Sequence, residues 1–71
     1  MYKVQAGTFK DRENADDLVK KLKTKGYDSF VFKDTDGLFK VQAGAFKEKE
    51  NADALAKELL ADGFDTFAYK D

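Results

Sequence analysis

The sequence contains no cysteine and no histidine, and Ser29 is its only serine. The fold therefore has no disulfide and no thiolate metal site, and zinc sites and nucleophilic triads are excluded. No apolar run approaches the roughly 18 residues that a membrane span needs, and the first residues lack the basic-then-apolar order of a signal peptide. We expect a chain without cofactor or membrane partner. If the chain works outside the cytoplasm, a parent protein would carry it there.

An excess of basic residues is also absent, since the net charge is -1. A general binder of nucleic acid or of anionic membranes would carry such an excess, so neither class of partner is expected. The 71 residues suffice for one small domain. Seven phenylalanines and three tyrosines can anchor its core. We expect a single monomeric domain over residues 1–71.

One phrase occurs twice: KVQAGTF at Lys3–Phe9 returns as KVQAGAF at Lys40–Phe46. Sliding the sequence by 37 positions sets a first repeat, residues 2–34, against a second, residues 39–71, and 19 of the 33 aligned pairs are identical. Such similarity indicates a tandem duplication. Each repeat reads as an alternating stretch, a charged stretch with apolar residues at helical spacing, a glycine, and a second β-rich stretch. The sequence therefore predicts βαβ twice.

Two amphipathic helices follow from apolar residues spaced i, i+3, i+4, i+7. The apolar positions are Ala15, Leu18, Val19 and Leu22 in the first repeat and Ala52, Leu55, Ala56 and Leu59 in the second. Asp11 is a plausible N-cap and Glu48 a poorer one, while Gly26 and Gly63 stand where a left-handed residue ends a helix. Between the repeats, DTDG at Asp34–Gly37 predicts a hairpin turn.

Two such units are most economically joined as an α+β, ferredoxin-like (RNP-like) βαββαβ fold. We expect a four-stranded antiparallel sheet with both helices on one face and the other face open to solvent or a ligand. Right-handed crossovers place the first and third strands in the centre, so the two KVQAG segments lie side by side about a pseudo-twofold axis.

Strand alternation then predicts which side chains face outward. In the central strands Val4, Ala6, Val41 and Ala43 share the helix side, and the outward set is Lys3, Gln5, Gly7, Lys40, Gln42 and Gly44. In the outer strands we expect Phe30, Phe32, Phe67 and Tyr69 to face the core, and Ser29, Val31, Lys33, Thr66, Ala68 and Lys70 to face outward. Because the acidic residues fall mainly on the helices, this assignment predicts a positive open face.

Individual outward residues have ordinary interpretations as well. Glutamine and lysine are common fillers of solvated strand positions, but Gln5 and Gln42 recur at the centre of the sheet. Gly7 and Gly44, two positions on, indicate a β-bulge, the close approach of a ligand, or both. The aromatics at the strand ends are expected to rim the core: Tyr2, Phe9, Tyr27, Phe39, Phe46 and Phe64.

Catalytic chemistry is not expected. The remaining candidates are carboxylates, which lie on exposed helix faces and turns rather than in a cleft. Acylphosphatases share the architecture but use an arginine in a phosphate-cradling loop, and the only arginine here, Arg12, begins a helix. The sequence predicts a binding domain, not an enzyme.

The motifs YKVQAGTF with ENADDLVKKLKTKGYDSFVF, and FKVQAGAF with ENADALAKELLADGFDTFAY, resemble the SPOR family, the sporulation-related repeat. The resemblance spans nearly the whole chain and is greatest to the C-terminal wall-binding domains of N-acetylmuramoyl-L-alanine amidases. It implies a peptidoglycan-binding module in the cell wall, attached to a catalytic domain in the parent protein. Its ligand would be glycan strands denuded of stem peptides, bound on the open face.

The resemblance also implies binding positions. They fall at Gln5, Thr8, Leu38 and Lys40, and Leu38 departs from the aromatic found there in some members. Glycan hydroxyls and N-acetyl amides suit Gln5, Gln42, Ser29 and Thr66, and the lactyl carboxylate freed by removal of the stem peptide would suit Lys3 and Lys40.

Two other functions stay open. The RNA-recognition motif has the same architecture and stacks single-stranded RNA on aromatics of its central strands. Here those positions carry lysine and glutamine, although a one-residue error in the pleat would expose Tyr2 and Phe39. The third possibility is a protein-interaction domain that pairs through an edge strand, which Lys33 and Lys70 near the strand ends oppose.

Overall fold

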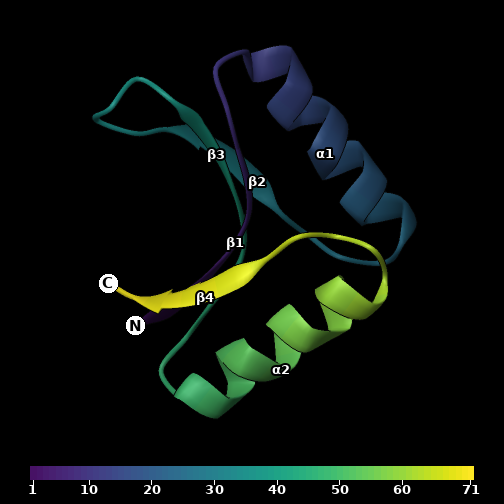
Figure 1. The fold of residues 1–71 in the computed structure, drawn as a ribbon, viewed down its shortest axis with the longest axis vertical. Coiled ribbons are helices and arrows are strands. Elements are labelled where there is room, and N and C mark those ends of the chain that lie inside the picture. The colour runs from purple at the N-terminus through teal and green to yellow at the C-terminus, as the bar shows by residue number, and fades with distance from the viewer.

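A computed structural model describes all residues, 1–71, and confirms the predicted βαββαβ order. The elements are β1 (Tyr2–Phe9), α1 (Arg12–Thr24), β2 (Phe30–Lys33), β3 (Phe39–Phe46), α2 (Lys49–Ala61) and β4 (Phe67–Lys70). The strands form one antiparallel sheet in the order β2-β3-β1-β4, so the two KVQAG strands are central as expected. Both helices cover the same side of the sheet, and the two chain ends lie side by side, at the start of β1 and the end of β4 (Figure 1).

The predicted ends of the elements are largely confirmed. Gly26 and Gly63 follow the helices with φ of 92° and 93°, the left-handed conformation that ends them. Gly37 has φ of 82° in the tight β2–β3 turn, where its N–H donates to the carbonyl of Asp34 at 2.9 Å. Asp11 occupies the N-cap position of α1, but its side chain makes no capping hydrogen bond.

The two central strands carry a pair of matching β-bulges. Val4 is paired with Gly44, Gln5 with Gln42 and Gly7 with Val41, so Ala43 and Ala6 are left without a partner between the paired residues. Each bulge shifts the pleat by one position. The glycine that follows therefore shares the side of a core valine, and the prediction that Gly7 and Gly44 face outward is wrong. A Cβ on Gly7 would lie 2.8 Å from Leu18 Cδ2, on the helix side of the sheet.

The predicted pleat of the outer strands is wrong by one residue. Phe30 is opposite Gln42 and Phe67 is opposite Gln5, so these phenylalanines share the open face with the glutamines. Val31 and Ala68 lie on the other side and pack against the core.

The core lies between the sheet and the helices. Leu22, Leu59, Val4 and Val41 are its largest fully buried side chains. The six aromatics expected at its rim, Tyr2, Phe9, Tyr27, Phe39, Phe46 and Phe64, all pack against it. Neither helix is long and apolar enough to cross a membrane.

Candidate functional site

Two glutamines form the centre of the face opposite the helices, which we call the open face. Gln5 and Gln42 are direct cross-strand partners in β1 and β3, and their exposed fractions are only 8% and 9%. Gln5 Nε2 donates a hydrogen bond to Thr8 Oγ1 at 2.8 Å. Gln42 makes no such bond, because the corresponding residue of its own strand is Ala45. The two amides therefore occupy equivalent positions, but only that of Gln5 is held by a hydrogen bond within the chain.

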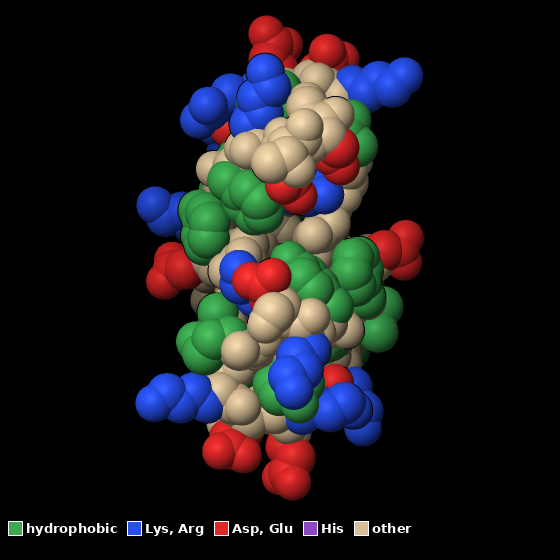
Figure 2. Space-filling view, turned by 90° about the vertical axis from the view of Figure 1, so that its left-hand side faces the viewer, with side chains coloured by type: hydrophobic (Ala, Val, Ile, Leu, Met, Phe, Trp, Pro, Cys, Tyr) green, Lys and Arg blue, Asp and Glu red, His purple; other side chains and the backbone are tan.

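Aromatic side chains flank this centre on both sides. On β2 the ring centroids of Phe30 and Phe32 lie 6.1 Å apart, and on β4 those of Phe67 and Tyr69 lie 5.7 Å apart. The exposed fractions of Phe30 and Phe67 are 53% and 54%, so both rings are accessible to a ligand. Figure 2 shows the face turned away from the helices, where hydrophobic side chains gather in separate patches with polar surface between them.

The lysines of the open face are paired with carboxylates of the same chain. Lys3 Nζ lies 2.6 Å from Asp71 Oδ2, and Lys40 Nζ lies 2.6 Å from Asp34 Oδ2 and 3.1 Å from Asp36 Oδ2. These contacts raise the pKa of both lysines. The prediction of a positive open face is therefore wrong, because carboxylates at the ends of β2 and β4 and in the hairpin turn neutralise it.

The same pairs lower the pKa of the acidic partners. The hydrogen bond from Lys40 is the main cause at Asp34, and that from Lys3 is the main cause at Asp71. At Asp36 the backbone N–H of Leu38 is the largest cause and Lys40 the next. Leu38, a predicted ligand residue, thus lies just before β3 and fixes the turn beside Lys40.

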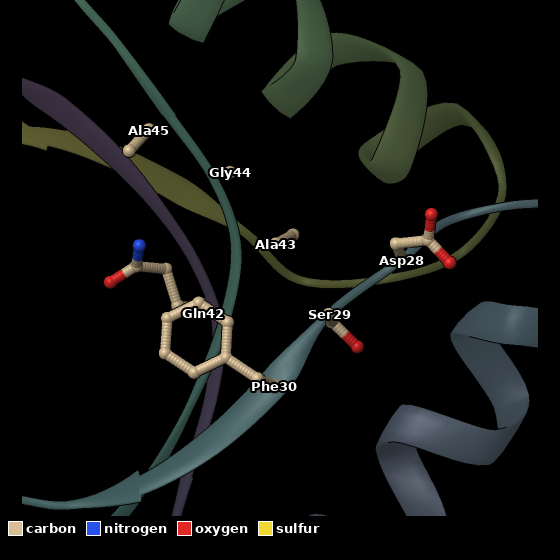
Figure 3. Close-up of a pocket in the computed structure, with 7 residues that line it drawn as sticks. All are labelled: Asp28, Ser29, Phe30, Gln42, Ala43, Gly44 and Ala45. Atoms are coloured by element: carbon tan, nitrogen blue, oxygen red, sulfur yellow. The ribbon is translucent and has the colours of Figure 1, made fainter.

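Four other residues predicted on the open face are turned toward the helices. Thr66 Oγ1 donates to the backbone carbonyl of Ala56 in α2 at 3.1 Å. Ser29 Oγ is buried without a hydrogen-bond partner and points away from Gln42 (Figure 3). Lys33 and Lys70 alternate with the outward aromatics, and their ammonium groups lie 5.8 and 6.0 Å from the rings of Phe39 and Tyr2.

The outward aromatics of β2 and β4 were not predicted from the sequence. In the strand FVFK, one face carries Phe30 and Phe32 and the other carries Val31 and Lys33, so each face offers an apolar residue to the core. Cross-strand pairing decides which face of β2 is outward. Phe30 and Phe32 are opposite Gln42 and Lys40 of β3, which were correctly assigned to the outward side, so the two phenylalanines lie on that side too.

The open face has the make-up of a binding surface. No group of three or more histidine, cysteine, aspartate or glutamate side chains could hold a metal ion. Amide groups between exposed rings can instead hydrogen-bond the polar edge of a ligand while the rings contact its apolar faces.

Comparison with known proteins accords with this geometry. The SPOR domain matches residues 1–70. The solution structure of the peptidoglycan binding domain of the B. subtilis cell wall lytic enzyme CwlC is similar, with a TM-score of 0.84 and 50% sequence identity over 96% of this chain and 85% of that one. Among curated proteins, no sequence matches the chain. The repeated VQAG strands, their shared fold and the match over residues 1–70 place the chain in the SPOR domain family.

Proposed function

We propose that this chain is a non-catalytic peptidoglycan-binding domain, which binds glycan strands through its open face. Membership in the SPOR family and the similarity to the peptidoglycan binding domain of a cell wall lytic enzyme support the ligand class. The domain would act in the cell wall and bring an attached hydrolase or septal protein to its substrate.

The observation that carries this proposal is the placing of aromatic pairs on both sides of the central glutamines. A sugar ring has apolar C–H faces and a polar edge of hydroxyl and amide groups. Phe30 and Phe67 can contact such faces with little loss of side-chain entropy, while Gln5 and Gln42 hydrogen-bond the edge. Successive sugars of a strand lying across the sheet would meet the same groups twice.

We further propose that the preferred strands lack stem peptides. In an intact strand muramic acid carries a peptide on its lactyl group, and a strand held against both aromatic pairs would bring that peptide close to the sheet. Because Lys3 and Lys40 are already paired with carboxylates, we assign this preference to bulk, and we assign the lysines to hydrogen bonds with sugar hydroxyls.

Co-sedimentation with purified sacculi, before and after removal of stem peptides by an amidase, tests both statements. We expect amidase treatment to raise binding, and Phe67→Ala and Gln42→Ala each to weaken it by roughly 1 kcal/mol or more. Lys20→Ala and Lys57→Ala, on the exposed surfaces of α1 and α2, are the matched controls. Equal binding before and after treatment would disprove the preference, and equal binding of wild type and Phe67→Ala would disprove the assigned face.

A further inference from the structure

A hollow of about 270 Å³ opens beside Gln42, at the place where β2 begins (Figure 3). It is lined by Asp28–Phe30 on one side and by Gln42–Ala45 on the other. This volume is close to the lower limit for small-molecule sites, about 300 Å³, so it suits a single sugar unit rather than an oligosaccharide.

The hollow exists because β2 is shorter than β3. The last residue of β3 that β2 covers is Gln42, and β3 runs on to Phe46. Successive strand residues direct their N–H and C=O groups to opposite edges, and Gly44 and Ala45 are regularly paired with β1. One of these two residues therefore presents an N–H and a C=O to the hollow, and no loop hydrogen bond covers them.

The side chains of the hollow leave a second polar group free. Gln42 makes no hydrogen bond within the chain, whereas its counterpart Gln5 is tied to Thr8. Apolar surface is supplied by Phe30, Ala43 and Ala45. The only charged side chain in the lining is Asp28, whose carboxylate points away from Gln42 (Figure 3), so the hollow offers no cation to a ligand carboxylate.

We infer that this hollow takes the acetamido group of an N-acetylglucosamine unit of the bound strand. The acetamido N–H and C=O match the free backbone edge of β3 and the Gln42 amide, and its methyl group fits the apolar lining. N-acetylmuramic acid would add a lactyl group, which carries a carboxylate once the stem peptide is removed and for which the lining offers no cationic partner. This inference rests on the proposed function and adds to it the sugar and the group recognised.

The pseudo-twofold counterpart of the hollow does not form such a site. There Thr8 replaces Ala45, and its hydroxyl engages the glutamine. The single acetamido site therefore lies in one half of the sheet, and it would fix the direction in which the strand crosses the open face.

Titration with chitotetraose, four linked N-acetylglucosamine units, tests the inference, and cellotetraose is the matched probe without acetamido groups. We expect chitotetraose to shift the backbone amide NMR signals of Phe30 and of Ala43–Ala45, and cellotetraose to leave them in place. Ala45→Thr should weaken chitotetraose binding by about tenfold, because it fills the hollow and offers Gln42 the partner that Thr8 gives Gln5. The variant copies a residue already accepted in the first repeat, and circular dichroism will verify its fold.

A shift pattern that is the same for both sugars, or chitotetraose affinity unchanged in Ala45→Thr, overturns the acetamido site. Gln42→Ala provides a second variant, expected to lose at least threefold in affinity through one hydrogen bond. Co-sedimentation with sacculi is read separately. If wild type binds sacculi but chitotetraose leaves the hollow unshifted, the inference fails and the proposed function stands; if chitotetraose shifts the hollow but sacculi are not bound, the proposed function fails alone.

Discussion

Replacing Gly7 or Gly44 by alanine separates a structural role of these glycines from a role in ligand contact. A Cβ on Gly7 would lie 2.8 Å from Leu18 Cδ2 and 2.8 Å from Phe9 Cε2, and one on Gly44 would lie 2.9 Å from Leu55 Cδ2 and 3.0 Å from Phe46 Cε2. Overpacking of this kind costs about 1 to 3 kcal/mol. Loss of glycine flexibility in the unfolded chain returns about 0.4 to 1 kcal/mol. We therefore expect Gly7→Ala to destabilise by roughly 1 to 2 kcal/mol, and Gly44→Ala by slightly less.

Urea unfolding measures this effect, and a double-mutant cycle identifies its cause. If the clash with Leu18 produces the loss, Gly7→Ala should cost about 1 kcal/mol less in a Leu18→Ala background than in the wild type. Because the new methyl group points to the helices, binding to sacculi per folded molecule should stay within about twofold. A neutral or stabilising Gly7→Ala would refute the packing argument, and a cost that is the same in both backgrounds would assign the clash to Phe9 instead of Leu18. Loss of binding with the fold intact would show that the bulge itself contacts the ligand.

Three further outcomes follow from the same structure. Leu22→Ala and Leu59→Ala should each destabilise by about 2 to 5 kcal/mol in urea unfolding, since both leucines are fully buried; a loss under about 0.5 kcal/mol would contradict the core assignment. Binding to sacculi should change less than about twofold between roughly 0.05 and 0.5 M salt, because Lys3 and Lys40 are paired internally, and a steep fall would mean that these lysines attract ligand charge. The hydrogen bond to Asp62 raises the pKa of Tyr27 to about 12, so the folded state holds this proton more tightly than the unfolded chain, whose tyrosine titrates near pH 10. The stabilisation by this hydrogen bond is complete below about pH 10 and is lost toward about pH 12. In Tyr27→Phe the urea unfolding midpoint should therefore fall less between these pH values than in the wild type; an equal fall in both proteins would exclude this bond as the cause.

The fold could be predicted because the patterns that determine it extend over the whole sequence. The duplication gives two βαβ units, and helix periodicity together with the hairpin turn leaves one economical sheet with the KVQAG strands in its centre. The outward positions of Lys3, Gln5, Lys40 and Gln42 were also predictable, because the central strands alternate clearly between polar and apolar residues before the bulge.

The outer strands could not be assigned from their own residues. Choosing the larger side chains for the core put Phe30 inside, but the space between sheet and helices is filled by leucines and by aromatics from the strand ends and loops. The smaller Val31 fits what is left, and the register with β3 turns Phe30 outward. The pairing of Lys40 with Asp34 was missed for a related reason, because hairpin geometry rather than sequence spacing joins them.

The two repeats have diverged unequally over the surface of the domain. On the open face Lys3, Gln5 and Phe30 are matched by identical residues 37 positions later, and Phe32 is matched by Tyr69, another aromatic. On the helix side, lysines in the last turn of α1 have no basic counterpart in the last turn of α2. Exposed residues at the start of the helices recur as well, Glu13 and Asn14 as Glu50 and Asn51, so the duplication itself accounts for part of this likeness. Core packing does not demand exposed aromatics or central glutamines. Under the proposed function, the successive sugars of a glycan strand would meet the two halves of the sheet in turn, and the recurrence of Phe30 as Phe67 fits that arrangement.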